Sequence, residues 1–317
     1  MCLFSRSIPH HEQTQVVDQE DAMAEDLPIT SKALFADWGK RVEAKQEQHK
    51  AIVEAPEYRL QLARLEQLTF DFIGALRLCW FASTRADDWV DKSLFMRSID
   101  DLMQSAVMIR TAVHEGARNS ARRELRYMIE LAIKSLYVDQ HMPTSSLEHR
   151  LIFFDRKLDP ASIAPVKNLE FHILGTLDAE TVVKKLLAAY SRACGYVHPS
   201  VFQIEERLEL ATKGISPGFE TADELCQSND EVFEAYSLTL VLLFEAIGGS
   251  FAGDIWETGG LGDRDDWVFH GHPLVAALDE HFDYKAERQD RLQAIKGRRA
   301  KRLTEANAVD WPVLKSR

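Results

Sequence analysis

Arg192 and His198 lie close together in the segment AAYSRACGYVHPS, residues 188–200, where Tyr190 and Tyr196 flank them. A histidine has an ordinary pKa of about 6.5, so its imidazole can accept or donate a proton near neutral pH. An arginine stays charged and can hold a phosphate group through two hydrogen bonds. Such a pair could cleave RNA without a metal ion, with His198 as the general acid and base and Arg192 holding the phosphate in the transition state.

The spacing of this pair does not distinguish it from other pairs in the chain. Three Arg–His pairs are separated by four to six intervening residues: Arg6/His11, Arg192/His198 and Arg264/His270. On an ideal helix, two residues six positions apart point about 120° away from each other. Arg192 and His198 can therefore converge only if the helix unwinds near Gly195 and Pro199, or if a dimer brings two copies together.

An earlier segment, NSARRELRYMIELAIKSLYVDQ, carries a regular series of arginines. Arg118, Arg122 and Arg126 recur every four residues and so lie on one side of a helix. Like charges at this spacing are unfavourable, so an anion such as RNA could compensate them. Glu130 is placed to pair with Arg126 and could reach Arg192 on a neighbouring helix. The alternative is a solvated arginine surface with one ordinary ion pair.

Two other segments could bind ligands. In DRDDWVFHGHP, residues 263–273, His270 and His272 could share a metal ion with a carboxylate if the segment is extended; the alternative is a loop docked by Trp267 and Phe269. The tail from residue 284 to 317 has ten basic and four acidic residues, a net charge of +6. It could contact RNA phosphates, the acidic surface of the chain itself, or a partner protein.

The elements that must position these residues are helices. Apolar residues recur with helical spacing over 31–55, 57–83, 88–115, 119–139, 178–198, 200–212 and 221–247, and the tail from 273 is also helical in pattern. Glycine-rich residues 248–266 read as irregular, and 141–177 as short helices and connections. No segment alternates like a strand. We therefore expect an all-α fold, an antiparallel helical bundle with an N-terminal helical extension and a charged C-terminal tail.

Composition narrows the function. The net charge of −12 excludes a protein that coats nucleic acid by bulk positive charge. The four cysteines are scattered, and the chain has no phosphate-binding loop, dinucleotide fingerprint or HExxH sequence, so no cofactor or metal is expected. The most apolar stretches carry charged residues and fall short of a membrane span. These features indicate a cytoplasmic protein that does not enter a membrane.

The segments RELRYMIELAIKSLY and YSRACGYVHPS make the chain similar to the HEPN superfamily, in particular to uncharacterised bacterial branches, over residues 88–250. The resemblance implies a helical bundle that dimerises and an Arg–His motif that forms a metal-independent ribonuclease site. Arg192 and His198 match the two motif positions. Glu130 matches an acidic residue on the preceding core helix and, with Arg126, would orient the catalytic pair. Members are common in toxin–antitoxin and antiphage systems, which implies an antitoxin or a defence-system protein as a further partner.

These observations give a domain plan and three hypotheses. The plan is an acidic flexible leader (1–30), a helical hairpin (31–87), a HEPN-like bundle (88–250), and an irregular segment with a basic helical tail (251–317). The first hypothesis is a metal-independent endoribonuclease or toxin. Its RNA contacts are predicted at four residues: Arg118, Arg122, Arg126 and Tyr196. The second is a catalytically inactive HEPN-like scaffold or sensor, and the third is a metal hydrolase centred on His270 and His272.

Overall fold

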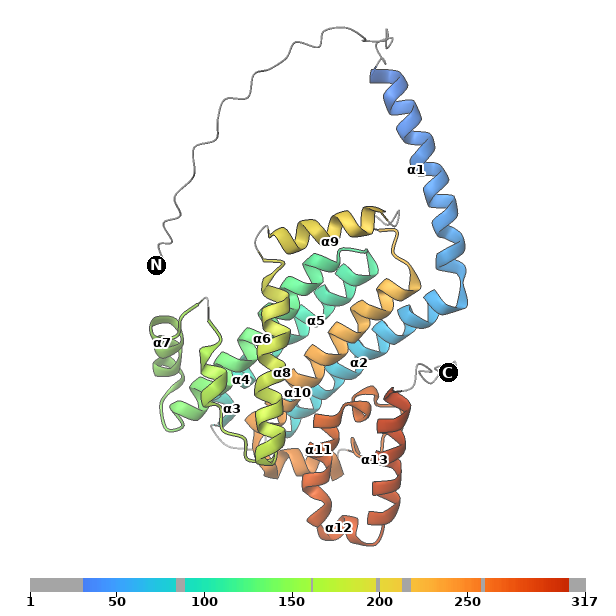
Figure 1. The fold of residues 1–317 in the computed structure, drawn as a ribbon. Coiled ribbons are helices and arrows are strands. Elements are labelled where there is room, and N and C mark those ends of the chain that lie inside the picture. The colour runs from blue at the N-terminus through green and yellow to red at the C-terminus, as the bar shows by residue number, and fades with distance from the viewer. Residues whose placement is uncertain are drawn as a thin grey trace, which may run out of the picture. The chain divides into compact units, whose positions relative to one another are not determined.

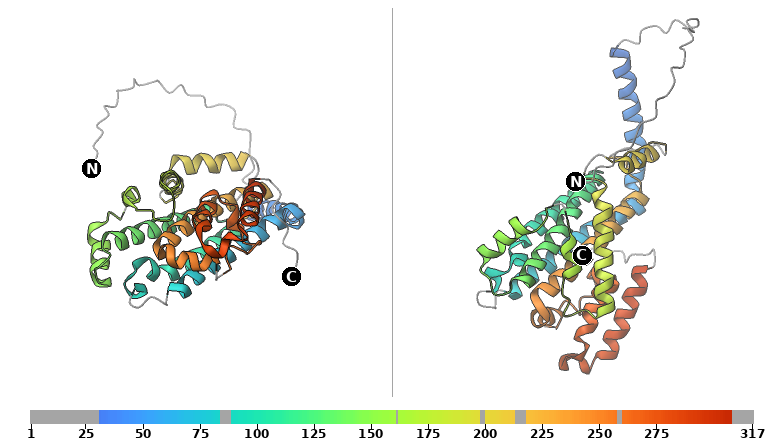
Figure 2. Two further views of the ribbon diagram at one scale, coloured as in Figure 1. Left: turned by 90° about the horizontal axis from the view of Figure 1, so that it is seen from below. Right: turned by 60° about the vertical axis from the view of Figure 1, so that its left-hand side comes forward.

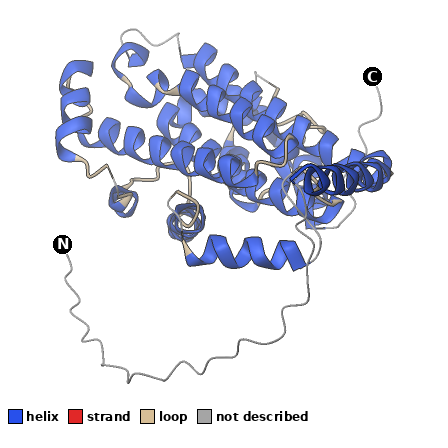
Figure 3. Ribbon diagram, turned by 90° about the horizontal axis from the view of Figure 1, so that it is seen from above, coloured by secondary structure: helices blue, strands red, loops and turns tan. Residues whose placement is uncertain are grey.

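The computed structural model describes residues 31–83, 89–160, 162–197, 200–212, 218–257 and 260–307. Every regular element in these ranges is a helix and none is a strand (Figure 3). The all-α prediction is therefore confirmed. The predicted acidic leader, residues 1–30, lies outside the described residues.

The chain divides into two compact units, one ending at Gln48 and the other beginning at His49. Of the first unit the structure describes residues 31–48, which belong to helix α1 (Ser31–Glu54). Each candidate site residue that the structure describes belongs to the second unit. The hairpin predicted over 31–87 therefore spans the boundary between the units, and helix α2 (Pro56–Ser83) shares a core with the helices that follow it.

Five long helices build the core of the second unit: α2, α5 (Ile99–His114), α6 (Arg118–His141), α8 (Thr176–Cys194) and α10 (Ala222–Glu257). Helix α10 packs along α2 and α6, and α6 also contacts α5 and α8 (Figure 1). The middle of α10, residues 238–244, is completely buried, and every side chain in it except that of Thr239 is apolar. This arrangement makes α6 and α8 neighbours, so the residues predicted to form a site come from adjacent helices.

The helix predicted over 88–115 is instead three helices, α3 (Trp89–Lys92), α4 (Leu94–Arg97) and α5. The break has a long-range cause. Asp139 of α6 accepts hydrogen bonds from the Ser93 hydroxyl (2.7 Å) and from the backbone N–H groups of Leu94 (2.8 Å) and Phe95 (2.9 Å). The carboxylate thus caps the start of α4, and a partner about 45 residues away is not visible in the local apolar pattern.

The predicted short helices between residues 141 and 177 are α7 (Leu147–Lys157) and the 3-10 helix η1 (Ala164–Asn168). The N-cap of helix α8 is Gly175 rather than Asp178. The next helix, α9 (Val201–Thr212), closely matches the helix predicted over 200–212. In Figures 1 and 2, α8 runs from the C-terminal helices at one end of the unit to α9 at the other.

The segment after Ile247 is more helical than predicted. Helix α10 passes through a non-helical Gly248 (φ 77°) and continues to Glu257. It is followed by η2 (Val268–Gly271), α11 (Pro273–His281), η3 (Phe282–Tyr284), α12 (Ala286–Gln289) and α13 (Leu292–Asn307). The docking role expected for Trp267 and Phe269 is confirmed, because both side chains are buried in the core.

Among the described residues, α10 is the one helix that is long and apolar enough to cross a membrane. However, 67% of its most apolar window is buried against the rest of the protein, as in the core helix of a soluble domain. Glu245 in this helix is also buried, and its carboxylate accepts hydrogen bonds from the backbone N–H groups of residues 172–174.

Candidate functional site

Helix α8 ends within the segment that separates the two predicted catalytic residues. Arg192 lies in its last turn, the helix stops at Cys194, and Gly195 forms the cap. The hydroxyl of Ser200 donates a hydrogen bond of 2.7 Å to the Gly195 carbonyl, which closes the turn into α9. The regular α-helix therefore ends near Gly195, and residues 195–197 continue as tighter turns in which each backbone N–H bonds the carbonyl three residues earlier.

Arg192 is an exposed residue beside a small cavity of about 30 Å³ between α6, α8 and α10, which Arg122, Glu231 and Glu234 also line. Within the described part of the chain, its guanidinium makes no hydrogen bond or ion pair and is open to solvent. His198 and Pro199 lie outside the described residues. The pairing of Arg192 with His198 consequently stays a prediction.

Glu130 is held by three other side chains. Its carboxylate accepts hydrogen bonds from Lys134 (2.5 Å) and Tyr190 (3.3 Å) and forms an ion pair with Arg126 (3.1 Å). The predicted pairing with Arg126 is confirmed. The expected contact with Arg192 is not formed, because residues 190 and 192 point about 200° apart on α8 and Tyr190 is the one that faces Glu130.

Arg126 belongs to the same internal cluster. It donates a hydrogen bond of 2.8 Å to the Tyr190 hydroxyl and another to Cys194 Sγ, and its guanidinium lies 5.0 Å from the centre of the Tyr190 ring. Burial, together with the nearby Glu130 carboxylate, raises the pKa of Tyr190 to about 12. With 22% of its side chain exposed, Arg126 is mainly a structural link between α6 and α8 rather than an open RNA contact.

Arg122 is not part of an exposed arginine face. Its Nε and Nη2 atoms donate parallel hydrogen bonds of 2.8 Å to Glu231, and Nη1 donates to Glu206 at 2.9 Å. Burial lowers the pKa of Arg122, but the hydrogen bonds and charges of Glu231 and Glu206 outweigh it and raise that pKa above its ordinary value. Two carboxylates already occupy this guanidinium, so RNA would have to displace them, and the predicted contact of Arg122 with RNA stays a prediction.

Tyr196 is also buried, with 1% of its surface exposed. The Arg122 guanidinium lies 4.2 Å from the centre of its ring, and the ring of Phe202 packs edge-on against it. The predicted contact of Tyr196 with RNA also stays a prediction, and it would require this side chain to become exposed. Its role is to anchor the turn between α8 and α9.

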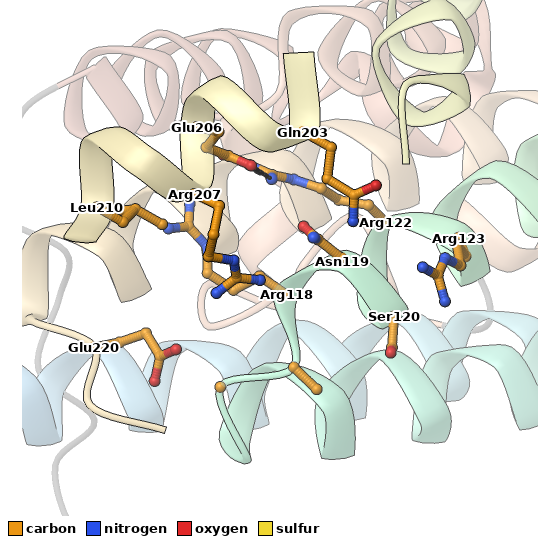
Figure 4. Close-up of a pocket in the computed structure, with 12 residues that line it drawn as sticks. Arg118, Asn119, Ser120, Arg122, Arg123, Gln203, Glu206, Arg207, Leu210 and Glu220 are labelled. Carbon is orange, nitrogen blue, oxygen red and sulfur yellow. Dashed lines mark hydrogen bonds and ion pairs between the residues drawn. The ribbon is translucent and has the colours of Figure 1, made fainter. Parts of the chain in front are cut away.

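Arg118, the remaining predicted RNA contact, lines a different space. A cavity of about 260 Å³ lies between the start of α6 and helix α9 (Figure 4). Its charged lining consists of four arginines and two glutamates: Arg118, Arg122, Arg123, Arg207, Glu206 and Glu220. Arg123 donates a hydrogen bond of 2.7 Å to the Tyr196 carbonyl, whereas Arg118 and Arg207 form no hydrogen bond or ion pair with the described residues.

Sequence reasoning missed the contribution of α9 to this cavity. Gln203, Glu206, Arg207 and Leu210 follow one another at spacings of three, one and three residues, so they form one face of the helix. That face points toward α6, while the apolar side chains of Val201, Ile204 and Leu208 are exposed. The polar residues at i, i+3 and i+4 of this face were a usable signal, but the apolar face of a helix normally faces inward, and here it does not.

The two histidines proposed as metal ligands point into different contacts. His270 Nε2 is hydrogen-bonded to the Leu261 carbonyl at 2.9 Å, and burial lowers the pKa of His270 to about 3. His272 Nε2 lies 3.1 Å from Glu234. Within the described ranges, no group of three or more histidine, cysteine or acidic residues could hold a metal ion.

The described part of the basic tail is paired with acidic groups of the chain itself. Arg288 and Arg299 are buried against Asp279 and Asp283, and Arg302 bonds Asp265 at 2.6 Å. Three alternatives were open for the tail: RNA, a partner protein, or the acidic surface of the chain itself. The described arginines of the tail bind acidic residues of the chain itself. Residues 308–317 lie outside the described part.

Compared with models of protein families, with curated proteins and with solved structures, the chain shows no significant match to any of them.

Proposed function

We propose that this protein is a HEPN-like, metal-independent endoribonuclease of the toxin or antiphage type, acting in the cytoplasm as a homodimer. In this proposal His198 moves the proton from and to the ribose and leaving-group oxygens, and Arg192 holds the phosphate. A HEPN-like antiparallel bundle is part of the same proposal. Arg118 would contact the RNA backbone, and an antitoxin or another defence protein would control the activity.

One observation carries the proposal: the α-helix ends at Cys194, two residues after Arg192, and the chain then turns toward α9. Gly195 caps α8, and Ser200 closes the turn. A continuous helix would hold positions 192 and 198 about 120° apart, so this break is the local geometry that a shared reaction centre needs. The open guanidinium of Arg192 supports the proposal further, because a phosphate could bind it without first displacing a carboxylate.

The test compares the wild type with His198→Ala and Arg192→Ala on RNA in the presence of a chelator. We expect the wild type to cut RNA under these conditions, and both variants to cut it at least 100-fold more slowly, because proton transfer and charge stabilisation each contribute about this much. Expression in bacteria, followed by growth and RNA integrity, provides the cellular readout.

Matched controls are His114→Ala and Arg156→Ala, which remove the same residue types at exposed positions on α5 and α7. Both should cut as the wild type does. Intact RNA with the wild type, or equal cleavage by the wild type and His198→Ala, would contradict the nuclease proposal. Cleavage that the chelator abolishes would instead favour a metal hydrolase.

A second candidate function, a catalytically inactive HEPN-like scaffold or sensor, is favoured by the placement of Glu130. The carboxylate that would orient the catalytic arginine is instead bound by Lys134, Arg126 and Tyr190. The RNA-cleavage assay on the purified protein distinguishes the two candidate functions. A scaffold leaves RNA intact and binds its ligand, and the substitutions Arg192→Ala and His198→Ala alter neither result.

A further inference from the structure

The cavity between α6 and α9 has the composition of an anion site. Arg118 and Arg207 extend into it from different helices and approach the same space in Figure 4. Two guanidinium groups in one cavity repel each other unless an anion lies between them. Neither forms an ion pair with a carboxylate of the described residues, although Glu206 and Glu220 line the same cavity. Arg118 Nε is also buried and has no hydrogen-bond partner. A buried donor without a partner costs free energy, so it points to a ligand that would accept its hydrogen bond.

The start of helix α6 also lines the cavity. Helix α6 begins at Arg118, and its N-cap, Ala117, has no side chain that can bond the first N–H groups. Residues 117–120 line the cavity, so this end of the helix, with its partial positive charge, adjoins the arginines. Asn119, Ser120 and Gln203 supply further polar side chains.

We propose that this cavity binds the terminal phosphate of a phosphorylated ligand, either the 5′ end of an RNA or a free nucleotide. A terminal phosphate carries close to two negative charges and three acceptor oxygens, which match two open guanidiniums and a helix N-terminus. The described lining contains no aromatic side chain on which a base could stack, so the cavity recognises the phosphate and leaves the remainder of the ligand outside. The proposal does not depend on RNA cleavage, because it rests on Arg118 and Arg207, and Arg192 is not among the described residues that line this cavity.

Glu220 provides a test of the proposal that has the opposite sign to removing an arginine. Its carboxylate lines the cavity and packs against Gly116, whose positive φ of 67° forms the turn before α6. A Cβ atom at position 116 would collide with this carboxylate, which shows how closely Glu220 approaches the start of the helix. Because Glu220 opposes a bound anion, removing its charge should strengthen anion binding, whereas removing an arginine should weaken it.

The experiment measures the binding of inorganic pyrophosphate to the full chain by titration calorimetry at low salt. We expect Arg118→Gln/Arg207→Gln to bind at least tenfold more weakly than the wild type, and Glu220→Gln to bind severalfold more tightly. Arg156→Gln, which removes an exposed arginine on α7, should bind as the wild type does. Thermal unfolding of each variant establishes that it is folded.

Competition then identifies the source of the phosphate. If a 5′-phosphorylated RNA displaces pyrophosphate and the same RNA with a 5′-hydroxyl does not, the ligand is an RNA end. If a nucleoside monophosphate displaces pyrophosphate and the nucleoside does not, the ligand is a free nucleotide. The proposal is overturned if pyrophosphate does not bind, or if the double variant binds as tightly as Arg156→Gln. Either result leaves the RNA-cleavage test untouched, because that test depends on Arg192 and His198.

Discussion

Two regions of the second unit are rich in arginine, and they use it in opposite ways. In the C-terminal region, Arg288 and Arg299 are each bonded to two or more carboxylates and are almost fully buried. In the cavity between α6 and α9, Arg118 and Arg207 have no partner among the described residues. The count of arginines is therefore a poor guide to where an anion can bind. What decides is whether acidic residues distant in the sequence fold onto them.

The difference follows from where carboxylates lie in space. Asp279 and Asp283 lie on α11 and η3, next to the arginines of α12 and α13, so this region neutralises itself. Near the cavity, Glu206 and Glu231 are both committed to Arg122. That commitment leaves the other arginines of the cavity unneutralised, apart from the influence of Glu220. The C-terminal region thus uses its arginines for stability, while the cavity keeps them for a ligand.

The largest effect is expected for Arg288→Met in the C-terminal region. The substitution removes one of the two arginines that bind Asp279 and leaves Glu257 with the more exposed Arg291; the side chains of Asp279 and Glu257 are 5% and 9% exposed. Breaking such a buried pair should lower the free energy of unfolding by about 4 kcal/mol, measured by urea denaturation. Arg291→Met is the control, because its side chain is 42% exposed and it shares Glu257; it should cost less than about 1 kcal/mol. Equal losses for both would show that burial does not set the cost.

Arg122→Met should have the next largest effect. It leaves Glu206 and Glu231 unpaired and close to each other, but these side chains are 25% and 20% exposed, so water can partly replace the arginine. We expect the free energy of unfolding to fall by about 2 to 3 kcal/mol. Arg123→Met, one residue away and exposed, should change it by less than about 1 kcal/mol. If Arg122→Met left the free energy of unfolding unchanged, the ion pairs of Arg122 would not stabilise the fold. Arg122 would then not differ from Arg118 in its contribution to stability.

The pH dependence of stability should also distinguish the C-terminal region. Burial lowers the pKa of His270 to about 3, against about 6.5 when unfolded. Between these values the unfolded chain binds the extra proton, so the stability that His270 contributes is present above pH 6.5 and is lost as the pH falls. From pH 7.5 to 5, the wild type should lose about 2 kcal/mol more than His270→Asn.

Comparison with His270→Asn is necessary because Asp71 acts in the opposite direction. Burial raises the pKa of Asp71 to about 6, so its contribution to stability falls as the pH rises from about 4 to 6. This contribution is the same in both proteins and cancels in their difference. The measurement is the difference in free energy of unfolding between the two proteins, obtained from urea denaturation at pH 7.5 and at pH 5. If this difference is the same at both pH values, His270 is not buried in solution.

The two regions also show how far the sequence alone could lead. Local periodicity was enough to predict α2, α6 and most of α10, because each buries a long apolar stripe. It could not predict the break at Ser93, which depends on Asp139 of another helix. For the same reason it marked Arg122 as a candidate RNA contact. The two glutamates that bind Arg122 lie 84 and 109 residues away, and no local pattern connects them.

The smallest change in stability is expected in the cavity. Arg118 and Arg207 make no ion pair in the described structure, so Arg118→Gln/Arg207→Gln should alter the free energy of unfolding by less than about 0.5 kcal/mol. The same variant should nevertheless lose the stabilisation that a ligand provides. Pyrophosphate at about 100 times its dissociation constant adds about 2.7 kcal/mol to a protein that binds it only when folded. This gain should appear in the wild type and also in Arg288→Met, whose cavity is intact. A double variant that is strongly destabilised, or still stabilised by pyrophosphate, would mean that these arginines support the fold as those of the C-terminal region do.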